Sequence, residues 1–194
     1  MAFHLPNKDR LRYLGEELGI DVDADYAQTV LDMLAPLVPE FRTVDRLPDQ
    51  TLPVRYPRAG GTRPEAKDNP WGAWSVRCDI RGAAEGPLAG KTVAIKDNVQ
   101  IAGVPMMNGA SLLEGYAPEG DATLVTRILD AGGHIVGKSA CEYFSFSGGS
   151  ATSAGGPVNS PRNPGHTPGG STTGSAALLV AGEVDMAIGA DQAG

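Results

Sequence analysis

The sequence contains little cysteine, no long apolar run and no cluster of positive charge. Its two cysteines, Cys78 and Cys141, cannot form a disulfide framework and lack the spacing of metal ligands. So few cysteines are typical of a reducing compartment, and we expect a cytoplasmic protein. No stretch approaches the roughly 18 apolar residues of a membrane span, and residues 1–9 contain no apolar signal core. We therefore expect neither a membrane-spanning nor an exported chain.

Positive charge is also scarce. The 194 residues include 16 Lys and Arg against 23 Asp and Glu, which gives a formal net charge of −7. No basic run is longer than two residues. Binding to phosphate groups needs clustered Lys and Arg, so this charge balance argues against nucleic acid and anionic membranes as partners. With 41% apolar residues, the chain can still build one domain with a real core.

Two common catalytic patterns are missing. The three histidines, His4, His134 and His166, are scattered and lack the spacing that holds zinc, so we expect no metal and no other cofactor. No G-x-S-x-G motif is present, which removes the basis for a Ser-His-Asp hydrolase.

The first part of the chain has a helical pattern. Leucines recur at helical spacing over 8–18, behind Asn7 as a candidate N-cap. A second helix is predicted over 23–37, beginning at an aspartate cap and ending before Pro39. We expect residues 1–42 to form a small helical region that serves for dimerisation, and hence a homodimer.

The middle of the chain is rich in proline, whereas the last part alternates between strand and helix patterns. Residues 43–87 include five prolines before Trp74, which predicts an extended connector. After Gly90, apolar β-rich runs alternate with amphipathic segments, which indicates an α/β domain. The predicted strands cover 92–95, 134–136 and 186–190, and the predicted helices cover the segment between an Asp121 cap and Gly132, a start at 139–144, and 175–181.

A long segment of Gly, Ser, Thr, Pro and Asn, residues 147–174, lies between these elements. Such a segment inside a compact domain is usually functional or disordered, and its place between core elements favours a functional loop. It contains Ser171, while Lys96 closes the first apolar strand. A lysine and a serine so placed are the two proton-handling groups of a Ser–Ser–Lys hydrolase. The alternative for Lys96 is a side chain that points to solvent. The alternative for the Gly/Ser-rich segment is a flexible linker.

Residues 132–139 match the phosphate-loop pattern G-x-x-x-x-G-K-[ST]. A phosphate loop follows a strand and has an open middle, whereas this segment follows a predicted helix and contains the β-branched pair Ile135-Val136. We therefore expect no nucleotide site here.

Cys141 and Glu142, together with Lys96, could supply the cysteine, glutamate and lysine of a nitrilase-like hydrolase. No distinctive sequence surrounds Cys141, and a lone cysteine among apolar residues more often fills a core. This chemistry remains an alternative.

Several blocks of sequence, in order, resemble the amidase signature family. They are GKTVAIKDN at 90–98 with GVPMMNG at 103–109, GGPVNSP at 155–161, GGSTTGSAA at 169–177 and GADQAG at 189–194. The helical first part and NPWGAW at 69–74 are similar to the branch of bacterial enantioselective amidases of nitrile metabolism. The resemblance implies a mixed central β-sheet covered by helices. It also implies that residues 88–194 are the front part of the catalytic domain of a longer chain.

The resemblance implies a Ser–cis-Ser–Lys triad. Lys96 would be the base and Ser171 the bridging serine, with a cis peptide bond between Gly170 and Ser171. The nucleophilic serine would occupy the position directly after Gly194. The implied oxyanion hole consists of backbone N–H groups of Gln192, Ala193 and Gly194.

Other residues take supporting roles in this interpretation. The implied substrate-binding residues are Ser147, Gly148, Gly149 and Ser150. Asp191, Gly170 and Thr172 would support the site structurally. The chain departs from the family pattern at Thr173, where serine or glycine is usual, and at Ala193, where glycine is usual.

The implied activity is the hydrolysis of a small-molecule carboxamide to a carboxylate and ammonia through a serine acyl-enzyme. Two alternatives remain open besides the nitrilase-like one. The substrate could contain a related acyl–nitrogen bond, as in a hydrazide or an aryl amide. The chain could instead be a non-catalytic truncated subunit that retains an amide pocket.

Overall fold

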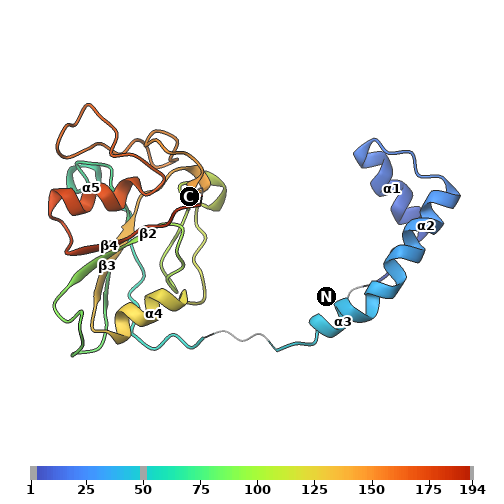
Figure 1. Cartoon of the computed structure of the whole chain (residues 1–194), viewed down its shortest axis with the longest axis horizontal. Coiled ribbons are helices and arrows are strands. Elements are labelled where there is room, and N and C mark those ends of the chain that lie inside the picture. The colour runs from blue at the N-terminus through green and yellow to red at the C-terminus, as the bar shows by residue number, and fades with distance from the viewer. Residues whose placement is uncertain (1–3, 49–51, 193–194) are drawn as a thin grey trace. The chain divides into compact units, whose positions relative to one another are not determined.

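The computed structural model describes residues 4–48 and 52–192 (Figure 1). The chain divides into two compact units, Met1–Gln50 and Thr51–Gly194. The first unit is helical and the second contains the sheet.

The helical unit contains α1 (Lys8–Leu18), α2 (Ala24–Leu34) and α3 (Val38–Val44), with a 3₁₀ turn at Ala35–Leu37. The prediction for α1 is confirmed, because the Asn7 side chain accepts a hydrogen bond from the Arg10 N–H and Gly19 ends the helix in the left-handed conformation. Helix α2 ends at Leu34 and the 3₁₀ turn at Leu37, before Pro39 as predicted, but α3, which begins at Val38, was not predicted. Pro39 lies in the first turn of α3, where its missing N–H leaves no helical bond unmade.

The second unit is built on a four-stranded sheet in the order β1-β3-β2-β4. Its strands are β1 (Trp74–Arg81), β2 (Thr92–Lys96), β3 (His134–Ser139) and β4 (Met186–Ile188). Strand β2 runs parallel to both β3 and β4, whereas β1 is antiparallel to β3. The predicted α/β class with a mixed sheet is therefore confirmed.

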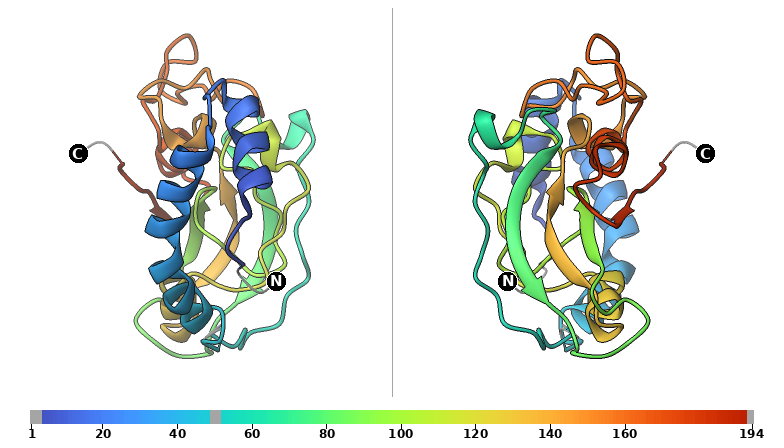
Figure 2. Two further views of the ribbon diagram at one scale, coloured as in Figure 1. Left: turned by 90° about the vertical axis from the view of Figure 1, so that its right-hand side faces the viewer. Right: turned by 90° about the vertical axis from the view of Figure 1, so that its left-hand side faces the viewer.

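Helices α4 (Thr123–Asp130) and α5 (Thr173–Ala181) cover opposite faces of the sheet, which can be followed in Figure 2. Alternate residues of β2 supply the two cores, because successive side chains of a strand point to opposite faces. Val93 and Ile95 pack in the cluster that contains α4 residues, and Ala94 packs in the cluster that contains α5 residues.

Three secondary-structure predictions for this unit need correction. Strand β1 lies inside the segment 43–87, where the sequence indicated an extended connector. Asp121 does not cap α4, whose N-cap is Ala122; the Asp121 carboxylate instead accepts from the Ala102 N–H at 2.9 Å and pairs with Arg58. The helix start predicted at 139–144 is a short 3₁₀ turn, Tyr143–Ser145, and not an α-helix, and Ser139 still belongs to β3.

The segment 132–139 does not form a phosphate loop. Residues His134–Ser139 are a sheet strand, and the Lys138 side chain is fully buried beside Asp97. Its ammonium group therefore faces the protein interior and not a bound phosphate.

The Gly/Ser-rich segment is attached to the rest of the unit through backbone hydrogen bonds. The Ala154 N–H donates to the Gly109 carbonyl at 2.8 Å, and the Asn159 N–H donates to the Trp71 carbonyl at 2.9 Å. Such bonds fit a loop that belongs to the core better than a free linker. In the part of the chain that the structure describes, no helix has the length and apolarity needed to cross a lipid bilayer.

Candidate active site

Three segments of the second unit meet at one edge of the sheet. Strands β2, β3 and β4 are parallel, so their carboxyl ends lie at the same edge, where α/β sheets commonly bind ligands. Lys96 is the last residue of β2, Ala190 follows β4, and Ser171 precedes α5. The topology thus brings together residues that are far apart in the sequence.

Lys96 lies at the centre of this meeting point. Its side chain is fully buried, and its Nζ donates to Ser171 Oγ at 2.7 Å and to the Ala190 carbonyl oxygen at 2.8 Å. The alternative of a strand-end lysine that points to solvent is therefore wrong. The sequence pairs Lys96 with Ser171 through the family resemblance, and the structure places their polar atoms in direct contact.

The surroundings of Lys96 disfavour its charged form. Burial lowers the pKa of the Lys96 amine below its ordinary value and outweighs Cys141 and Asp191, which act in the opposite direction. The two hydrogen bonds described for its Nζ are accepted by a hydroxyl and a carbonyl and not by a carboxylate. A buried amine held in this way is suited to accept a proton.

The backbone around Ser171 has the form that the resemblance implies. The peptide bond between Gly170 and Ser171 is cis. A side chain at Gly170 would overlap the carbonyl oxygen of Gly149, so the two loops approach each other more closely than a Cβ allows. Thr172 joins the same site, because its Oγ1 donates to the Ala190 carbonyl at 2.9 Å.

A cavity of about 290 Å³ opens beside Ser171. Ser147 and Gly148 line it, as do Asp191 and Gln192. Ser150 does not line it; this residue is buried, and its carbonyl accepts from the Val158 N–H at 3.0 Å. Of the residues assigned to the oxyanion hole, Ala193 and Gly194 lie outside the described residues.

The sequence analysis missed two phenylalanines that line this cavity, Phe144 and Phe146. The Phe146 side chain is 93% exposed, and Phe144 has a φ of 48°, in the left-handed region. The available signal was a cluster of aromatic residues at 143–146 in a chain that is only 6% aromatic. These rings give one wall of an otherwise polar cavity an apolar surface.

Thr173, which departs from the family pattern, starts α5 two residues before the predicted helix. Its buried hydroxyl donates to the Ala140 carbonyl at 3.2 Å. The hydroxyl thus ties α5 to the end of β3 and is not directed at the cavity beside Ser171.

The nitrilase-like set is not assembled. The Cys141 Sγ donates weakly to Asn108 Oδ1 at 3.5 Å, and burial raises the pKa of this thiol to about 11. The Glu142 carboxylate accepts from the Thr152 N–H at 2.9 Å and from the hydroxyl of the same residue. A protonated thiol is a poor nucleophile and this carboxylate is bonded to Thr152, so the geometry favours Cys141 as a core residue.

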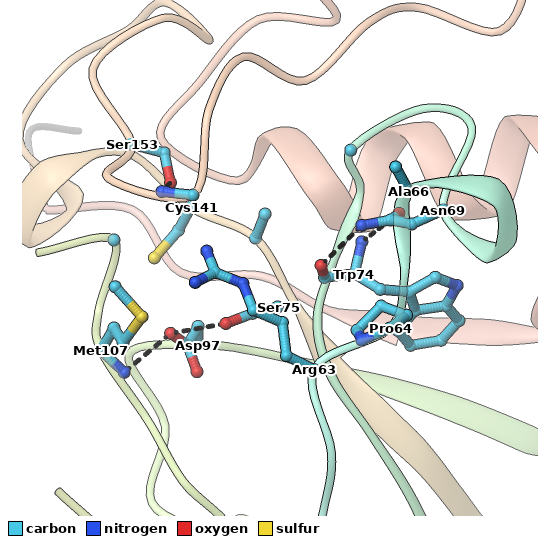
Figure 3. A pocket seen from close by; sticks show the side chains of 14 residues that line it. Arg63, Pro64, Ala66, Asn69, Trp74, Ser75, Asp97, Met107, Cys141 and Ser153 are labelled. Atoms are coloured by element: carbon cyan, nitrogen blue, oxygen red, sulfur yellow. Dashed lines mark hydrogen bonds between the residues drawn. The ribbon is translucent and has the colours of Figure 1, made fainter. Parts of the chain in front are cut away.

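A second cavity, of about 240 Å³, lies near the carboxyl end of β2 (Figure 3). Arg63, Asp97, Met107, Cys141 and Ser153 are among the residues that line it. On one side of this cavity, Asp97 Oδ2 accepts from the Ser75 hydroxyl at 3.2 Å and from the Met107 N–H at 3.0 Å. The sequence analysis did not identify Asp97 as a residue of interest.

Metal-ligating side chains do not gather in residues 4–48 and 52–192. No group of three or more His, Cys, Asp or Glu side chains there is arranged to hold a metal ion.

Comparison with known proteins finds relatives that are named for amide chemistry. The profile of the family described as Amidase matches residues 73–194. An enantioselective amidase of Rhodococcus rhodochrous is 41% identical over 191 residues, which cover 97% of this chain and 37% of that relative. A glutamyl-tRNA(Gln) amidotransferase subunit from Haloarcula marismortui is 49% identical over 115 residues, which cover 59% of this chain and 27% of that relative.

Solved structures agree with the sequence relatives. A glutamyl-tRNA(Gln) amidotransferase subunit from Thermotoga maritima has a TM-score of 0.59 and 36% identity, covering 62% of this chain and 27% of that one. Native peptide amidase of Stenotrophomonas maltophilia has a TM-score of 0.50 and 34% identity, covering 53% and 22%.

The protein is an α/β protein with a mixed sheet and a buried lysine at the carboxyl end of β2. The known proteins that it resembles are named for amide chemistry. The chain belongs to the amidase signature family, which confirms the resemblance in its sequence. It spans between about a quarter and two fifths of the length of these sequence relatives.

Proposed function

We propose that the protein hydrolyses a small-molecule carboxamide to a carboxylate and ammonia through a serine acyl-enzyme. The observation that carries this proposal is the contact of 2.7 Å between the buried Lys96 Nζ and Ser171 Oγ. In this proposal Lys96 is the base, Ser171 the bridging serine, and a serine directly after Gly194 the nucleophile.

Proton transfer follows from the hydrogen-bonding capacity of the two side chains. A hydroxyl has one donor and two acceptor sites, so Ser171 can donate to a neutral Lys96 amine while it accepts a proton from the nucleophile. A lysine with its ordinary pKa of about 10.4 would be charged at neutral pH and could not accept. The burial that lowers the pKa of Lys96 supports its role as a base.

The reaction then proceeds in two steps. The nucleophilic oxygen attacks the amide carbonyl carbon, the C–N bond breaks, and the proton from the nucleophile leaves with ammonia. Water attacks the acyl-enzyme and releases the carboxylate. Backbone N–H groups of Gln192, Ala193 and Gly194 would stabilise the oxyanion, each by about 3 kcal/mol in comparable acyl-transfer enzymes.

The cavity beside Ser171 is the proposed acyl pocket. Ser147 and Gly148 line it with the two phenylalanines, which supports an acyl group that has an apolar part. Hydrazides and aryl amides contain the same acyl–nitrogen linkage and remain alternative substrates. A non-catalytic subunit remains the alternative if no serine follows Gly194.

We also propose that the protein is a homodimer in the cytoplasm. The helical unit leaves several of its own apolar side chains exposed, among them Leu18 at 73% and Met33 at 68%, which supports an interaction surface there. Both cysteines are free, which supports a reducing compartment. Sedimentation of the intact protein tests the dimer, which a monomer at micromolar concentration would exclude.

A fluorophosphonate probe tests the proposed chemistry directly. In the intact protein, mass spectrometry should locate one probe adduct on the serine after Gly194. Ser171→Ala should form the adduct far more slowly, because the relay is interrupted. Absence of any adduct, or an adduct on another residue, would contradict the proposed acyl-enzyme.

A further inference from the structure

A buried ion pair lies immediately beside the proposed base. Lys138 Nζ is 3.1 Å from Asp97 Oδ1 and also donates to the Asp97 carbonyl oxygen at 3.4 Å. Lys138 is fully buried and Asp97 is 1% exposed. Desolvating two charges is costly, so a pair at this depth is weak evidence for stability and calls for another explanation.

Three separate segments hold the Asp97 carboxylate. Ser75 comes from β1, Met107 from the loop after β2, and Lys138 from β3; Figure 3 shows the bonds to the first two. The Asp97 N–H also donates to the Ser139 carbonyl at 3.0 Å, which continues the ladder between β2 and β3. The residue that follows the proposed base is therefore fixed through both its side chain and its backbone.

The position of Lys96 depends on this attachment. One peptide bond separates it from Asp97, and its Nζ must stay within hydrogen-bond reach of Ser171 Oγ and the Ala190 carbonyl. Displacements of about 1 Å in a catalytic group can cost about a hundredfold in rate. An attachment at the residue next to Lys96 would limit such displacements.

The pair also affects the balance of charge around the end of β2. The other titratable groups that face Lys96 are Cys141 and Asp191, and those that face Lys138 are Cys78 and Cys141. Burial raises the pKa of both thiols to about 11, so neither carries charge at neutral pH. When Lys138 is cationic and Asp97 anionic, the pair has no net charge, and Asp191 is the remaining acidic group that raises the pKa of Lys96.

We propose that the Asp97–Lys138 ion pair is the positioning element of the proposed base: it fixes the end of β2 and, through internal charge cancellation, leaves Lys96 free to be neutral. This inference rests on the proposed role of Lys96. Asp97 and Lys138 act through Lys96 and touch no reacting atom.

The sign of the electrostatic effect follows from Coulomb's law. In Lys138→Gln the Asp97 carboxylate keeps its donors Ser75 and Met107 but loses its cationic partner. The uncompensated negative charge then favours the ammonium form of Lys96. The acid limb of the pH profile, where kcat/KM rises as Lys96 loses its proton, should move to higher pH by on the order of one unit. At a given pH on that limb, kcat/KM should then fall roughly tenfold.

Two further variants serve as controls. Asp97→Asn combined with Lys138→Gln removes both charges, so the acid limb should return to its wild-type position. Lys91→Gln makes the same charge change at a lysine whose side chain is 54% exposed, beside Asp185, and it should leave the limb unmoved. If the acid limb of Lys138→Gln lies at the same pH as that of the wild type, the electrostatic part of the proposal is wrong.

Ser75→Ala tests the positioning part without leaving an unpaired charge, and it serves if Lys138→Gln does not fold. Loss of one donor to Asp97 should lower kcat by about tenfold with little change in KM. A wild-type kcat would overturn the positioning role. The proposed function fails if Lys96→Ala retains activity. If Lys96→Ala is inactive but the Lys138 and Ser75 variants behave as wild type, only the inference about the ion pair fails.

Discussion

The ends of β2 and β3 each carry a fully buried lysine, and the two lysines have different partners. Lys96 is held by a hydroxyl and a backbone carbonyl, whereas Lys138 is held by the Asp97 carboxylate. Burial lowers the pKa of both amines; Asp97 opposes this at Lys138 through a contact of 3.1 Å, and Asp191 opposes it at Lys96. The comparison teaches that the partner, more than the depth of burial, decides whether a buried lysine is suited to act as a base or as a structural cation.

The largest expected effect is the loss of activity when Lys96 is removed. Lys96→Ala in the intact protein should lower kcat by about a thousandfold, because general base catalysis contributes on the order of 10²–10⁴. Steady-state kinetics on a carboxamide would measure this, with Lys91→Ala as a control of equal size at the surface. Near-normal turnover in Lys96→Ala would show that Lys96 is not the base, and the two lysines would then not differ in function as proposed.

The second effect concerns stability at Lys138. Lys138→Met leaves the Asp97 carboxylate buried without its cationic partner, which should lower the free energy of unfolding by about 3–5 kcal/mol. Urea denaturation would measure it. An unchanged midpoint would show that the ion pair makes no net contribution and would weaken the distinction between the two lysines.

Lys96→Met should behave in the opposite way. The folded-state pKa of Lys96 is lowered relative to the unfolded chain, so below the unfolded pKa of about 10.4 folding must remove a proton or bury a charge. Replacement by Met removes this cost, and the variant should unfold at higher urea than wild type at pH 7. The difference should shrink as pH rises toward about 10. A difference that grows with pH would contradict the assigned direction.

The smallest effect is expected at the cavity wall. Phe146→Ala should raise KM for amides with an aromatic acyl group by about tenfold or less and leave small aliphatic amides nearly unaffected, because only the larger group reaches the ring. Stability should change little, since the side chain is 93% exposed. Equal KM changes for both substrate classes would remove Phe146 from substrate selection.

Local signals in the sequence predict elements that depend on neighbouring residues. Asn7 and Gly19 bound α1 through contacts within the helix itself, and the apolar run at β2 needs no distant partner to be recognised. Strand β1 escapes prediction because the prolines before it suggest a connector and because its pairing with β3 is interrupted by register shifts. Asp121 is misassigned because distant partners, Arg58 and Ala102, outcompete the local cap.

The site likewise contains features that the sequence predicts and features that it does not. The family blocks anticipate the pairing of Lys96 with Ser171, and their contact at 2.7 Å fits it. The pairing of Lys138 with Asp97 is not anticipated, since a lysine in a glycine-bounded segment first suggests a phosphate loop. Only the parallel pairing of β2 with β3 brings the two residues together. Phe146 escapes notice because it follows a 3₁₀ turn of three residues and belongs to no periodic pattern.

Ala190 takes part in the site only through its main chain: its carbonyl oxygen accepts from both Lys96 and Thr172, and its N–H is 3.4 Å from Thr172 Oγ1. Side chains other than proline can therefore be placed at this position without deleting any of these bonds. Inserting or deleting a single residue between β4 and Asp191 would instead move a different carbonyl into the position opposite the lysine. Loop length, more than side-chain identity, is the variable to hold constant when this segment is transplanted or redesigned.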